Sequence, residues 1–256
     1  MEHYTITERR NKIIEILNET GKVYVKNLSE LFGVSVVVIR SDLAELEKQS
    51  VLTRIHGGAI TNYKSYYNMS LVQRANTNAH QKKAIGKKIN DLINDNDTVI
   101  MNAGTTLLFA IQEITKKNVT IITNSISIAL DGAKNPDLKI ILLGGDVNCD
   151  YQFTYGVNVV KSLEQYNADL LIMSVDGIDI EKGISTYYYQ EAEICRQMMN
   201  CAKKIIVAAD YSKINRTSFA QIGNFSKIDA IITSSDANTD YINKLKKQGI
   251  DILIAK

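Results

Sequence analysis

Small and hydroxyl-bearing residues follow three successive predicted strands in the C-terminal part of the chain. They are Asn102, Ala103, Gly104, Thr105 and Thr106 after the first strand, Thr123, Asn124 and Ser125 after the second, and Gly144 and Gly145 after the third. Residues without bulky side chains let a backbone approach a ligand, and the free N–H groups at a helix N-terminus attract phosphate. Each group alone is weak evidence, because Ser and Thr are common helix caps. Three groups at matching strand ends, where open parallel sheets bind ligands, favour an anion-binding pocket.

Charged residues near the ends of two further predicted strands could complete such a pocket. Asp176 follows the fourth strand, Glu191 enters the next helix, and Lys213 follows the fifth strand. A lysine ammonium can balance a phosphate, and carboxylates accept hydrogen bonds from sugar hydroxyls. In the alternative, structural interpretation, Asp176 and Asp210 cap turns and Glu191 lies on an exposed helix face. The sequence has neither a GxGxxG nor a GxxxxGK[ST] motif, so we expect no nucleotide cofactor.

A second group of residues, near the N-terminus, has the pattern of a DNA-reading helix. Ser35 can cap this helix, and its apolar residues recur at i, i+4 and i+7. These apolar residues are Ile39, Leu43 and Leu46, and the opposite face carries Val37, Ser41, Ala44 and Lys48. A shorter helix ending at Gly33 precedes it, and an extended segment closing at residues 57–58 follows it. This order is typical of a winged helix-turn-helix, and a small three-helix bundle is the alternative.

The number of charges in residues 1–60 does not distinguish a winged helix-turn-helix from a three-helix bundle, because the segment holds eight basic and eight acidic side chains. Their placement favours DNA binding, because several basic residues lie along edges that would face a DNA backbone. These residues are Arg9, Arg10, Lys22, Lys26, Arg40 and Arg54. Basic side chains on phosphates release counterions, and this release supplies affinity.

From about Asp97 the sequence alternates short Val- and Ile-rich runs with helix-length segments. The predicted strands are Thr98–Met101, Val119–Thr123, Lys139–Leu143, Leu170–Val175, Ile205–Ala208, Ala230–Thr233 and Ile250–Ile254. Continuous apolar strands separated by helices predict a mainly parallel sheet with both faces covered, and the helix after the first strand should begin near Leu107. The predicted fold class is therefore α/β. We expect a winged helix-turn-helix over residues 1–60, a linker over 61–80 that contains Tyr63, Tyr66 and Tyr67, and a larger α/β domain over 81–256.

Composition limits the class of protein. The chain has 256 residues, 45% hydrophobic and 23% charged, as in ordinary globular proteins. Its formal net charge of +2 gives no global attraction to nucleic acid, so DNA binding would depend on local arrangement. Three unpatterned cysteines fit reduced thiols, and three scattered histidines argue against a zinc site. No apolar run reaches the roughly 18 residues of a membrane span, and residues 1–10 lack a signal-peptide core, so we expect a cytoplasmic chain without a membrane partner.

Several short motifs occur at distinctive distances in the first 60 residues. They are Glu8-Arg9-Arg10, Phe32-Gly33-Val34-Ser35, Ile39-Arg40, Asp42-Leu43, Leu46-Glu47 and Arg54-Ile55-His56-Gly57-Gly58-Ala59. Together they resemble the DNA-binding domain of the DeoR family of bacterial sugar-responsive repressors, and the last motif is the most specific. The resemblance implies a double-stranded DNA operator as a partner. The candidate DNA-binding residues are Lys22, Lys26, Ser35, Val36, Val37, Val38, Arg40, Ser41, Ala44, Arg54, His56 and Gly57.

The rest of the chain resembles the DeoR-type effector domain, which is itself similar to ribose-5-phosphate isomerase. This resemblance implies a phosphorylated sugar as effector, no cofactor and no metal, and assembly into a homodimer or homotetramer through the larger domain. The effector-binding residues that it implies are Asn102, Gly104, Thr105, Thr106, Thr123, Asn124, Ser125, Gly144, Gly145, Asp176, Glu191 and Lys213.

The predicted recognition helix departs from the family pattern. Where the family usually has polar residues and a Thr, this chain has Val36, Val37 and Val38, and Ser41 replaces a second basic residue. Loss of an Arg removes a phosphate or guanine contact, whereas an outward Val37 or Ala44 can meet thymine methyls. We interpret Val36 and Val38 as packing under the wing. These residues predict an A·T-leaning operator that is bound more weakly than is typical.

Three further departures concern the wing and the pocket. Ser50 stands where the family generally has Gly, so the turn into the wing should be less relaxed. Asn102 stands where the family commonly has Asp, and the family also commonly has a basic residue near Asn148, after the double glycine. Loss of that cation would lower phosphate affinity or would point to a less charged ligand.

Two classes of function follow. The first is a sequence-specific DNA-binding transcriptional regulator of carbohydrate genes, most often a repressor in this family, whose DNA binding changes when a phosphorylated sugar binds. The second is a sugar-phosphate isomerase with a fused DNA-binding module, because Asp176, Asp179, Lys182 and Glu191 are residue types that such an enzyme uses. The isomerases separate their Asp-Gly-x-Asp and Lys-Gly elements by a longer, Gly-rich loop, whereas Asp179 and Lys182 lie three residues apart here. We therefore expect no catalysis, and we interpret Asp179 as part of a turn and Lys182 as solvated.

Overall fold

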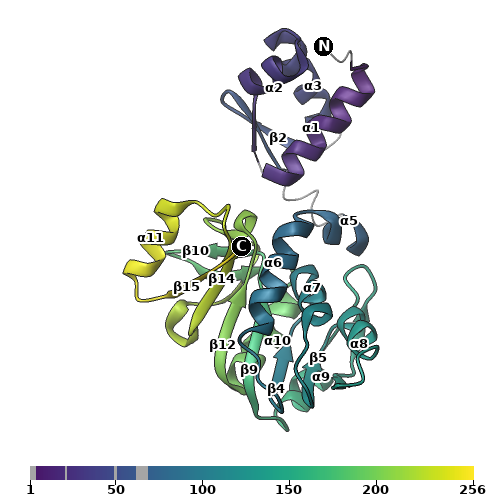
Figure 1. The fold of residues 1–256 in the computed structure, drawn as a ribbon, viewed down its shortest axis with the longest axis vertical. Helices are drawn as coiled ribbons and strands as arrows, with labels where there is room; N and C mark the ends of the chain where they lie inside the picture. The colour runs from purple at the N-terminus through teal and green to yellow at the C-terminus, as the bar shows by residue number, and fades with distance from the viewer. Residues whose placement is uncertain (1–3, 21, 49–50, 62–68) are drawn as a thin grey trace. The chain divides into compact units, whose positions relative to one another are not determined.

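The structure, a computed structural model, describes residues 4–20, 22–48, 51–61 and 69–256. The chain forms two compact units, Met1–Asn78 and Ala79–Lys256 (Figure 1). Residues 62–68 of the predicted linker, which include Tyr63, Tyr66 and Tyr67, and also Ser50, lie outside the described residues. The predicted boundaries at residues 60 and 81 stay a prediction.

In its described residues, the smaller unit contains three helices packed on a three-stranded sheet and a fourth, short helix further along the chain. Its elements are α1 (Ile6–Thr20), β1 (Lys22–Tyr24), α2 (Val25–Phe32), α3 (Val36–Lys48), β2 (Leu52–Ile55), β3 (Gly58–Thr61) and, further along the chain, α5 (Leu71–Asn76). The strands pair antiparallel in the order β1-β3-β2. Gly33 ends α2 with a φ of 62°, which favours glycine. One apolar cluster joins the three helices to the sheet, so the winged arrangement has its own core.

Local contacts explain where α3 begins and how the wing closes. The Ser35 hydroxyl accepts a hydrogen bond from the Val38 N–H at 3.4 Å, as predicted for a helix cap. At the start of β3, a Cβ on Gly58 would lie 2.1 Å from the Val23 carbonyl oxygen. Only glycine therefore lets β3 pair closely with β1.

The larger unit is built on a seven-stranded parallel sheet. The strands are β4 (Thr98–Met101), β5 (Val119–Thr123), β6 (Leu138–Leu142), β9 (Ala168–Ser174), β12 (Ala202–Ala208), β14 (Ala230–Ser234) and β15 (Asp251–Ala255). Their order across the sheet is β15-β14-β12-β9-β4-β5-β6, and every neighbouring pair is parallel. All seven predicted strands are present, with ends shifted by up to three residues. The α/β fold class is thereby confirmed.

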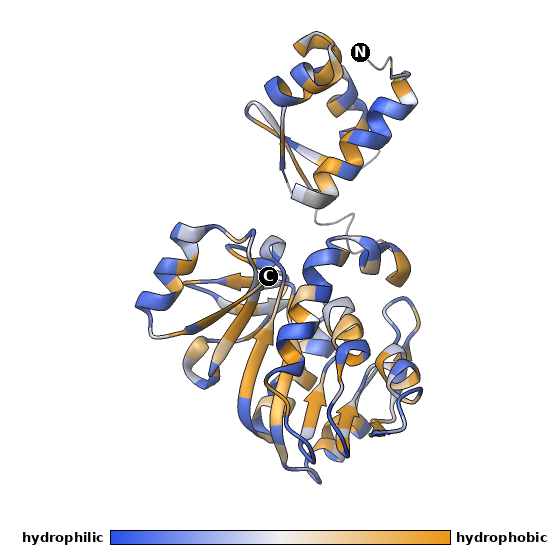
Figure 2. Cartoon of the chain, viewed as in Figure 1, coloured by the Kyte–Doolittle hydropathy of each residue, from blue (hydrophilic) through white to orange (hydrophobic). Residues whose placement is uncertain are grey.

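Helices cover both faces of this sheet, and the strands between them are strongly apolar (Figure 2). One buried cluster lies on the side of α6 (Ala79–Asn90), α7 (Thr105–Glu113) and α8 (Ile126–Gly132). The other lies on the side of α9 (Val157–Leu163), α10 (Tyr189–Asn200) and α11 (Thr239–Lys247). Helix α7 begins at Thr105, two residues before the predicted position near Leu107.

Two small antiparallel structures at the strand ends were not predicted. One is a hairpin of β7 (Asp146–Asn148) and β8 (Phe153–Tyr155). The other is a sheet of β10 (Gly177–Asp179), β11 (Gly183–Thr186) and β13 (Ala220–Gly223). Their strands have only three or four residues, too few for a clear alternation in the sequence. Among the helices of the described ranges, none has the length and apolarity that crossing a bilayer requires.

Candidate functional site

Helix α3 presents one buried face and one exposed face, as its spacing predicts. Ile39, Leu43 and Leu46 are buried in the core of the smaller unit. Val37 is 68% exposed and Arg40 and Ser41 are also exposed. This exposed face has the width and the residue types of a helix that enters a major groove.

The three consecutive valines at the start of α3 do not behave alike. Val36 is 41% exposed, so the interpretation that it packs under the wing is wrong. Val38 is half-buried, and so is Ala44, which was expected to point outward. Val36 is the first residue of α3, and its exposure leaves it available to a partner together with Val37.

The wing brings further basic residues beside α3. A concave region of about 340 Å³ is lined by Val25, Arg40, Leu43, Arg54, Ile55, His56, Gly57 and Gly58. Arg54 is half-exposed, and its guanidinium lies 3.6 Å from the Glu47 carboxylate. Gly57 adopts a φ of 77°, which closes the β2–β3 turn. The structure thus places Arg40 and three predicted residues of the wing around one concavity.

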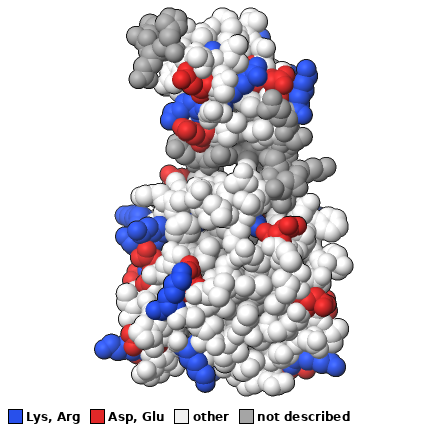
Figure 3. All heavy atoms as spheres, turned by 90° about the vertical axis from the view of Figure 1, so that its right-hand side faces the viewer, with Lys and Arg blue, Asp and Glu red and all other residues white. Residues whose placement is uncertain are grey.

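Of the other candidate cations, Lys22 and Lys26 are exposed on β1 and α2. The Lys22 ammonium lies 4.6 Å from the centre of the Tyr24 ring. On the face of the smaller unit seen in Figure 3, basic and acidic side chains are interspersed. This face is therefore not uniformly basic, and a DNA contact on it would come from selected residues.

Arg9 and Arg10 were expected to face the DNA backbone, and for Arg9 this expectation is wrong. The Nε atom of Arg9 lies 2.6 Å from Oδ2 of Asp42, and both side chains are buried. The Nε atom of Arg10 lies 2.9 Å from Oδ1 of the same carboxylate, with about a quarter of the Arg10 side chain exposed. Asp42 faces α1 from the buried side of α3, so these arginines hold the two helices together.

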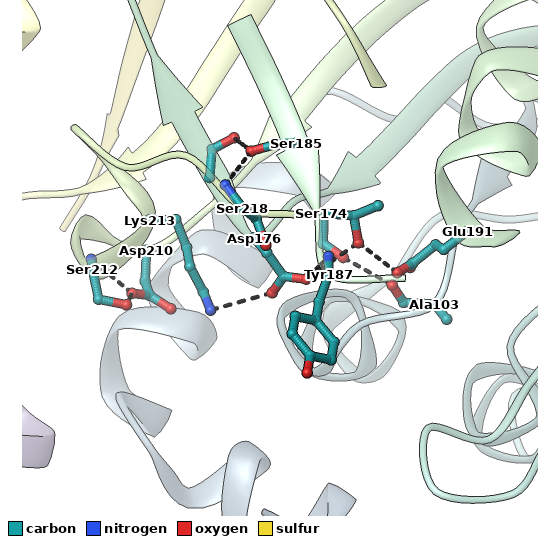
Figure 4. A network of polar contacts seen from close by, with 12 residues as sticks. Ala103, Ser174, Asp176, Ser185, Tyr187, Glu191, Asp210, Ser212, Lys213 and Ser218 are labelled. Atoms are coloured by element: carbon teal, nitrogen blue, oxygen red, sulfur yellow. Dashed lines mark hydrogen bonds and ion pairs between the residues drawn. The ribbon is translucent and has the colours of Figure 1, made fainter. Parts of the chain in front are cut away.

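In the larger unit, the structure connects four of the predicted effector-binding residues through one polar network (Figure 4). The Lys213 ammonium lies 3.5 Å from Oδ1 of Asp176. The other oxygen of Asp176 accepts the Tyr187 N–H at 3.0 Å and lies 3.2 Å from the Thr186 hydroxyl. That hydroxyl lies 2.7 Å from Oε2 of Glu191, and Oε1 of Glu191 lies 3.4 Å from the Asn102 amide nitrogen. Glu191 is buried rather than on an exposed helix face, so the structural alternative for it is wrong.

The side chain of Asn102 joins the ends of strands β4 and β9. Its Oδ1 accepts the Ser174 N–H at 2.8 Å, and its Nδ2 donates to the Ser174 carbonyl at 3.0 Å. Beside it, the Cys195 sulfur lies 3.4 Å from the same amide nitrogen. Burial raises the pKa of the Cys195 thiol well above its usual value, and the neighbouring Glu191 carboxylate adds to this shift. Asn102 therefore positions the base of the network, and Cys195 stays protonated at neutral pH.

The α7 N-terminus approaches this network closely. Gly104 precedes the helix with a φ of 157°, and a Cβ there would lie 2.0 Å from the Ser174 hydroxyl oxygen. Thr105 and Thr106 form the first turn and are nearly buried. The backbone N–H groups of this turn and the helix dipole favour an anion.

The segment after β5 makes its own set of contacts. The Thr123 hydroxyl accepts the Ser125 N–H at 3.0 Å, and the Ser125 hydroxyl accepts the Ile128 N–H at 3.3 Å. The Asn124 amide nitrogen donates to the Thr154 carbonyl at 3.0 Å. Among the described residues, Asn124 has a buried Oδ1 atom for which no hydrogen-bond partner is present. A ligand donor such as a sugar hydroxyl would satisfy it.

The double glycine after β6 serves packing at one of its two positions. A Cβ on Gly145 would lie 2.4 Å from the Tyr155 carbonyl oxygen, whereas a Cβ on Gly144 would meet nothing within 4 Å. Gly145 thus allows the β7–β8 hairpin to fold back. Only Gly144 leaves open space that a ligand could use.

Two residues that the sequence did not single out as binding residues complete the region of Lys213. Asp210 is buried and accepts the Ser212 N–H at 2.9 Å. Burial opposes its ionisation, but the charges of Lys213 and Lys82 together with the hydrogen bonds from Ser212 outweigh burial, and the pKa of Asp210 is lowered. The spacing from Asp210 to Lys213 was visible in the sequence, whereas Lys82 lay inside a helix and gave no signal.

The isomerase alternative finds no support in this geometry. The Asp179 carboxylate accepts the N–H groups of Glu181 and Lys182 at 2.9 Å, as in an ordinary turn, and Lys182 is exposed. In the β10–β11 hairpin, Asp179 pairs with Gly183, at the end opposite to Asp176. Lys182 therefore lies at the turn of this hairpin, away from Asp176, as expected from the short spacing between Asp179 and Lys182.

Comparison with known proteins agrees with the division of the chain into a DNA-binding unit and a larger unit. Residues 9–65 match the family model of the DeoR-like helix-turn-helix domain, and residues 77–235 match that of the DeoR C-terminal sensor domain. A protein of Escherichia coli O157:H7 named as a transcriptional repressor of the aga operon is 35% identical, over 97% of this chain and 93% of that protein. The HTH-type transcriptional repressor GlcR of Bacillus subtilis is 32% identical, over 97% of this chain and 96% of that protein. Among solved structures, ribose 5-phosphate isomerase from Plasmodium falciparum aligns with a TM-score of 0.39 and 19% identity, over 52% of each chain.

Proposed function

Because the chain belongs to the DeoR family of DNA-binding transcriptional regulators and is not an enzyme, we propose that it represses carbohydrate-metabolism genes until a phosphorylated sugar binds its sensor unit. The observation that carries this proposal is the exposed face of α3 beside a wing that holds Arg54 and His56. In the sensor unit, the corresponding observation is the ion pair between the buried Lys213 and the partly exposed Asp176.

For operator recognition, the exposed face of α3 enters the major groove. Arg40 contacts a phosphate or a guanine, while Val36 and Val37 lie against thymine methyls. Arg54 and His56 of the wing contact the backbone or the minor groove. The operator is therefore A·T-leaning at the positions that α3 reads, and an unbiased selection that returns guanine-rich operators would contradict this.

Titrations of labelled operator with the full chain test this mode of binding. Arg40→Ala should weaken binding of all sequences about equally if Arg40 holds a phosphate, and should relax preference at one position if it reads a base. Lys12→Ala is the matched control, because Lys12 is a half-exposed cation on α1 that pairs with Glu15. If both variants bind like the unmodified chain, α3 is not the recognition helix.

The effector lies where Asp176, Glu191 and Lys213 meet the N-terminus of α7. The Lys213 ammonium and the first N–H groups of α7 bind the phosphate, and the carboxylates accept hydrogen bonds from the sugar hydroxyls. The unpartnered oxygen of Asn124 accepts a further hydroxyl. A free sugar lacks the anionic group and should bind more weakly.

A thermal-unfolding screen with sugar monophosphates and their unphosphorylated sugars identifies the effector, because a ligand selective for the folded state stabilises it. Lys213→Ala should abolish the shift that the effector produces. Lys203→Ala, which removes an exposed lysine paired with Asp169, should leave the shift intact. A full shift in Lys213→Ala would show that the effector binds elsewhere.

We further propose a homodimer or homotetramer assembled through the sensor unit, which works in the cytoplasm, where the chromosome lies. Two recognition helices in a dimer would read half-sites about 34 Å, or one DNA turn, apart. Sedimentation of the full chain with and without operator measures the assembly. A monomer that binds a single half-site with full affinity would rule this assembly out.

A further inference from the structure

Lys82 is the most deeply buried lysine of the described residues, at 1% exposure. It lies on α6, whose next residue, Lys83, is a largely exposed lysine within reach of Glu113. Ile85 and Ile89 of the same helix are fully buried in the core. A buried ammonium is costly unless a counter-charge accompanies it, so Lys82 needs a reason for its place on the inner face of α6.

The geometry points to Asp210 as the counter-charge. The Gln81 amide, next to Lys82 on α6, donates to the Asp236 carboxylate just after β14 at 3.2 Å. The charges of Lys213 and Lys82 also act to lower the pKa of the buried Asp210 carboxyl. The placement of α6 agrees, because α6 packs against β14. Tyr211 is the residue after Asp210, and its N–H donates to the Ser234 hydroxyl at the end of β14 at 3.2 Å. Lys82, Asp210 and Lys213, which are buried, and the partly exposed Asp176 thus form one cluster of alternating charge.

Helix α6 is also the first element of the sensor unit. The smaller unit ends at Asn78 and α6 begins at Ala79, so the chain leaves the DNA-binding unit and enters this helix directly. Any displacement of α6 is therefore transmitted by covalent connection to the segment that joins the two units.

We propose that Lys82 is the residue through which α6 responds to the anionic group of the effector, a proposal that rests on the effector site described above. A phosphate monoester held by Lys213 competes with Asp210 for the Lys82 ammonium. The contacts of α6 then differ between the free and the liganded state, and only such a difference can shift the population of DNA-binding arrangements. Lys82 thereby couples effector binding to operator release, in addition to adding affinity.

The test measures the operator dissociation constant of the full chain with and without the sugar monophosphate that gives the largest thermal shift. Inorganic phosphate and the matching free sugar serve as ligand controls. Lys82→Met should reduce the effector-induced change in operator affinity at least about tenfold, equivalent to about 1.4 kcal/mol of coupling. Lys83→Met, the neighbouring exposed position, should leave it unchanged. A purely structural role of Lys82 would lower the melting temperature but leave this ratio intact.

Each result has a defined meaning. A folded Lys82→Met variant with the unmodified ratio overturns the inference. If Lys82→Met does not fold, Lys82→Arg decides, because it keeps the charge but moves it. For Lys82→Arg, a change of threefold or more in the effector-induced change in operator affinity supports the role, and an unmodified ratio overturns it. An unmodified chain that binds operator but responds to no sugar monophosphate overturns the proposed effector site as well, which separates that failure from a failure of Lys82 alone.

Discussion

Replacing Asp42 with alanine should destabilise the DNA-binding unit more than any exposed substitution in it. The carboxylate holds Arg9 at 2.6 Å and Arg10 at 2.9 Å through different oxygens, and it is buried between α1 and α3. Its loss leaves the buried Arg9 guanidinium without its counter-charge. Removing one partner of a buried ion pair typically costs about 3–5 kcal/mol. Because proteins have a total stability of roughly 5–15 kcal/mol, this cost would remove between about a fifth and all of the free energy that keeps α3 in place.

Hydrogen exchange followed by mass spectrometry measures this effect within the full chain, because peptides from residues 4–48 report on the smaller unit separately from residues 79–256. The expected loss corresponds to exchange faster by roughly two to four orders of magnitude in α1 and α3, at about 1.4 kcal/mol per tenfold. Peptides of the seven-stranded sheet should be unchanged.

Glu47→Gln is the matched control, because it removes an ion pair of α3 at the surface. Its partner Arg54 lies 3.6 Å away and both side chains are roughly half exposed, so the expected cost is about 0–1 kcal/mol. If α1 and α3 are protected from hydrogen exchange as well in the Asp42→Ala variant as in the Glu47→Gln variant, the buried charges do not hold the recognition helix, and the reasoning is refuted.

Three further outcomes are expected. Gly104→Ala should destabilise the sensor unit by about 1–3 kcal/mol, because the positive φ and the Ser174 hydroxyl both oppose a Cβ at this position. Gly144→Ala should be nearly neutral, because a Cβ there meets nothing within 4 Å. Thermal unfolding compares the two variants, and equal melting temperatures would contradict the view that only Gly104 is required by the fold. Because the pKa of Asp210 is lowered on folding, its stabilising contribution is complete above its unfolded pKa of about 3.9 and is lost as the pH falls below that value. Urea unfolding of the Asp210→Asn variant should therefore show a smaller loss of stability in acid than the unmodified chain. An unaltered dependence of stability on pH would argue against this role of Asp210. Iodoacetamide at neutral pH should modify the exposed Cys149 well before Cys195, whose pKa is raised by burial, and mass spectrometry that finds equal labelling would show that α10 opens readily.

Much of the chain was predictable because the relevant signals are local. The apolar runs of the seven parallel strands, such as Val119–Thr123, need no information beyond themselves, since a strand buried on both faces is apolar throughout. Likewise, the spacing of Ile39, Leu43 and Leu46 and the cap at Ser35 define α3 from its own sequence. The motif ending in Ala59 identified the family from residues alone.

What escaped prediction depends on contacts between segments that are distant in sequence. Nothing near Arg9 indicates that its partner is Asp42, 33 residues away, so a buried ion pair was interpreted as a DNA contact. Lys82 lies 128 residues from Asp210, and a lysine on an amphipathic helix is normally solvated. The exposure of Val36 depended on where the wing falls relative to the first turn of α3.

The sequence by itself determined the elements, the family and the residue types available for chemistry, because helix caps, apolar periodicity and short motifs act over a few neighbouring residues. Only the tertiary structure decided which charged side chains stabilise the fold and which lie together at the strand ends. The physical reason is that a charge acquires its role from its burial and its partner. Both are fixed by packing between segments that the linear order does not place side by side.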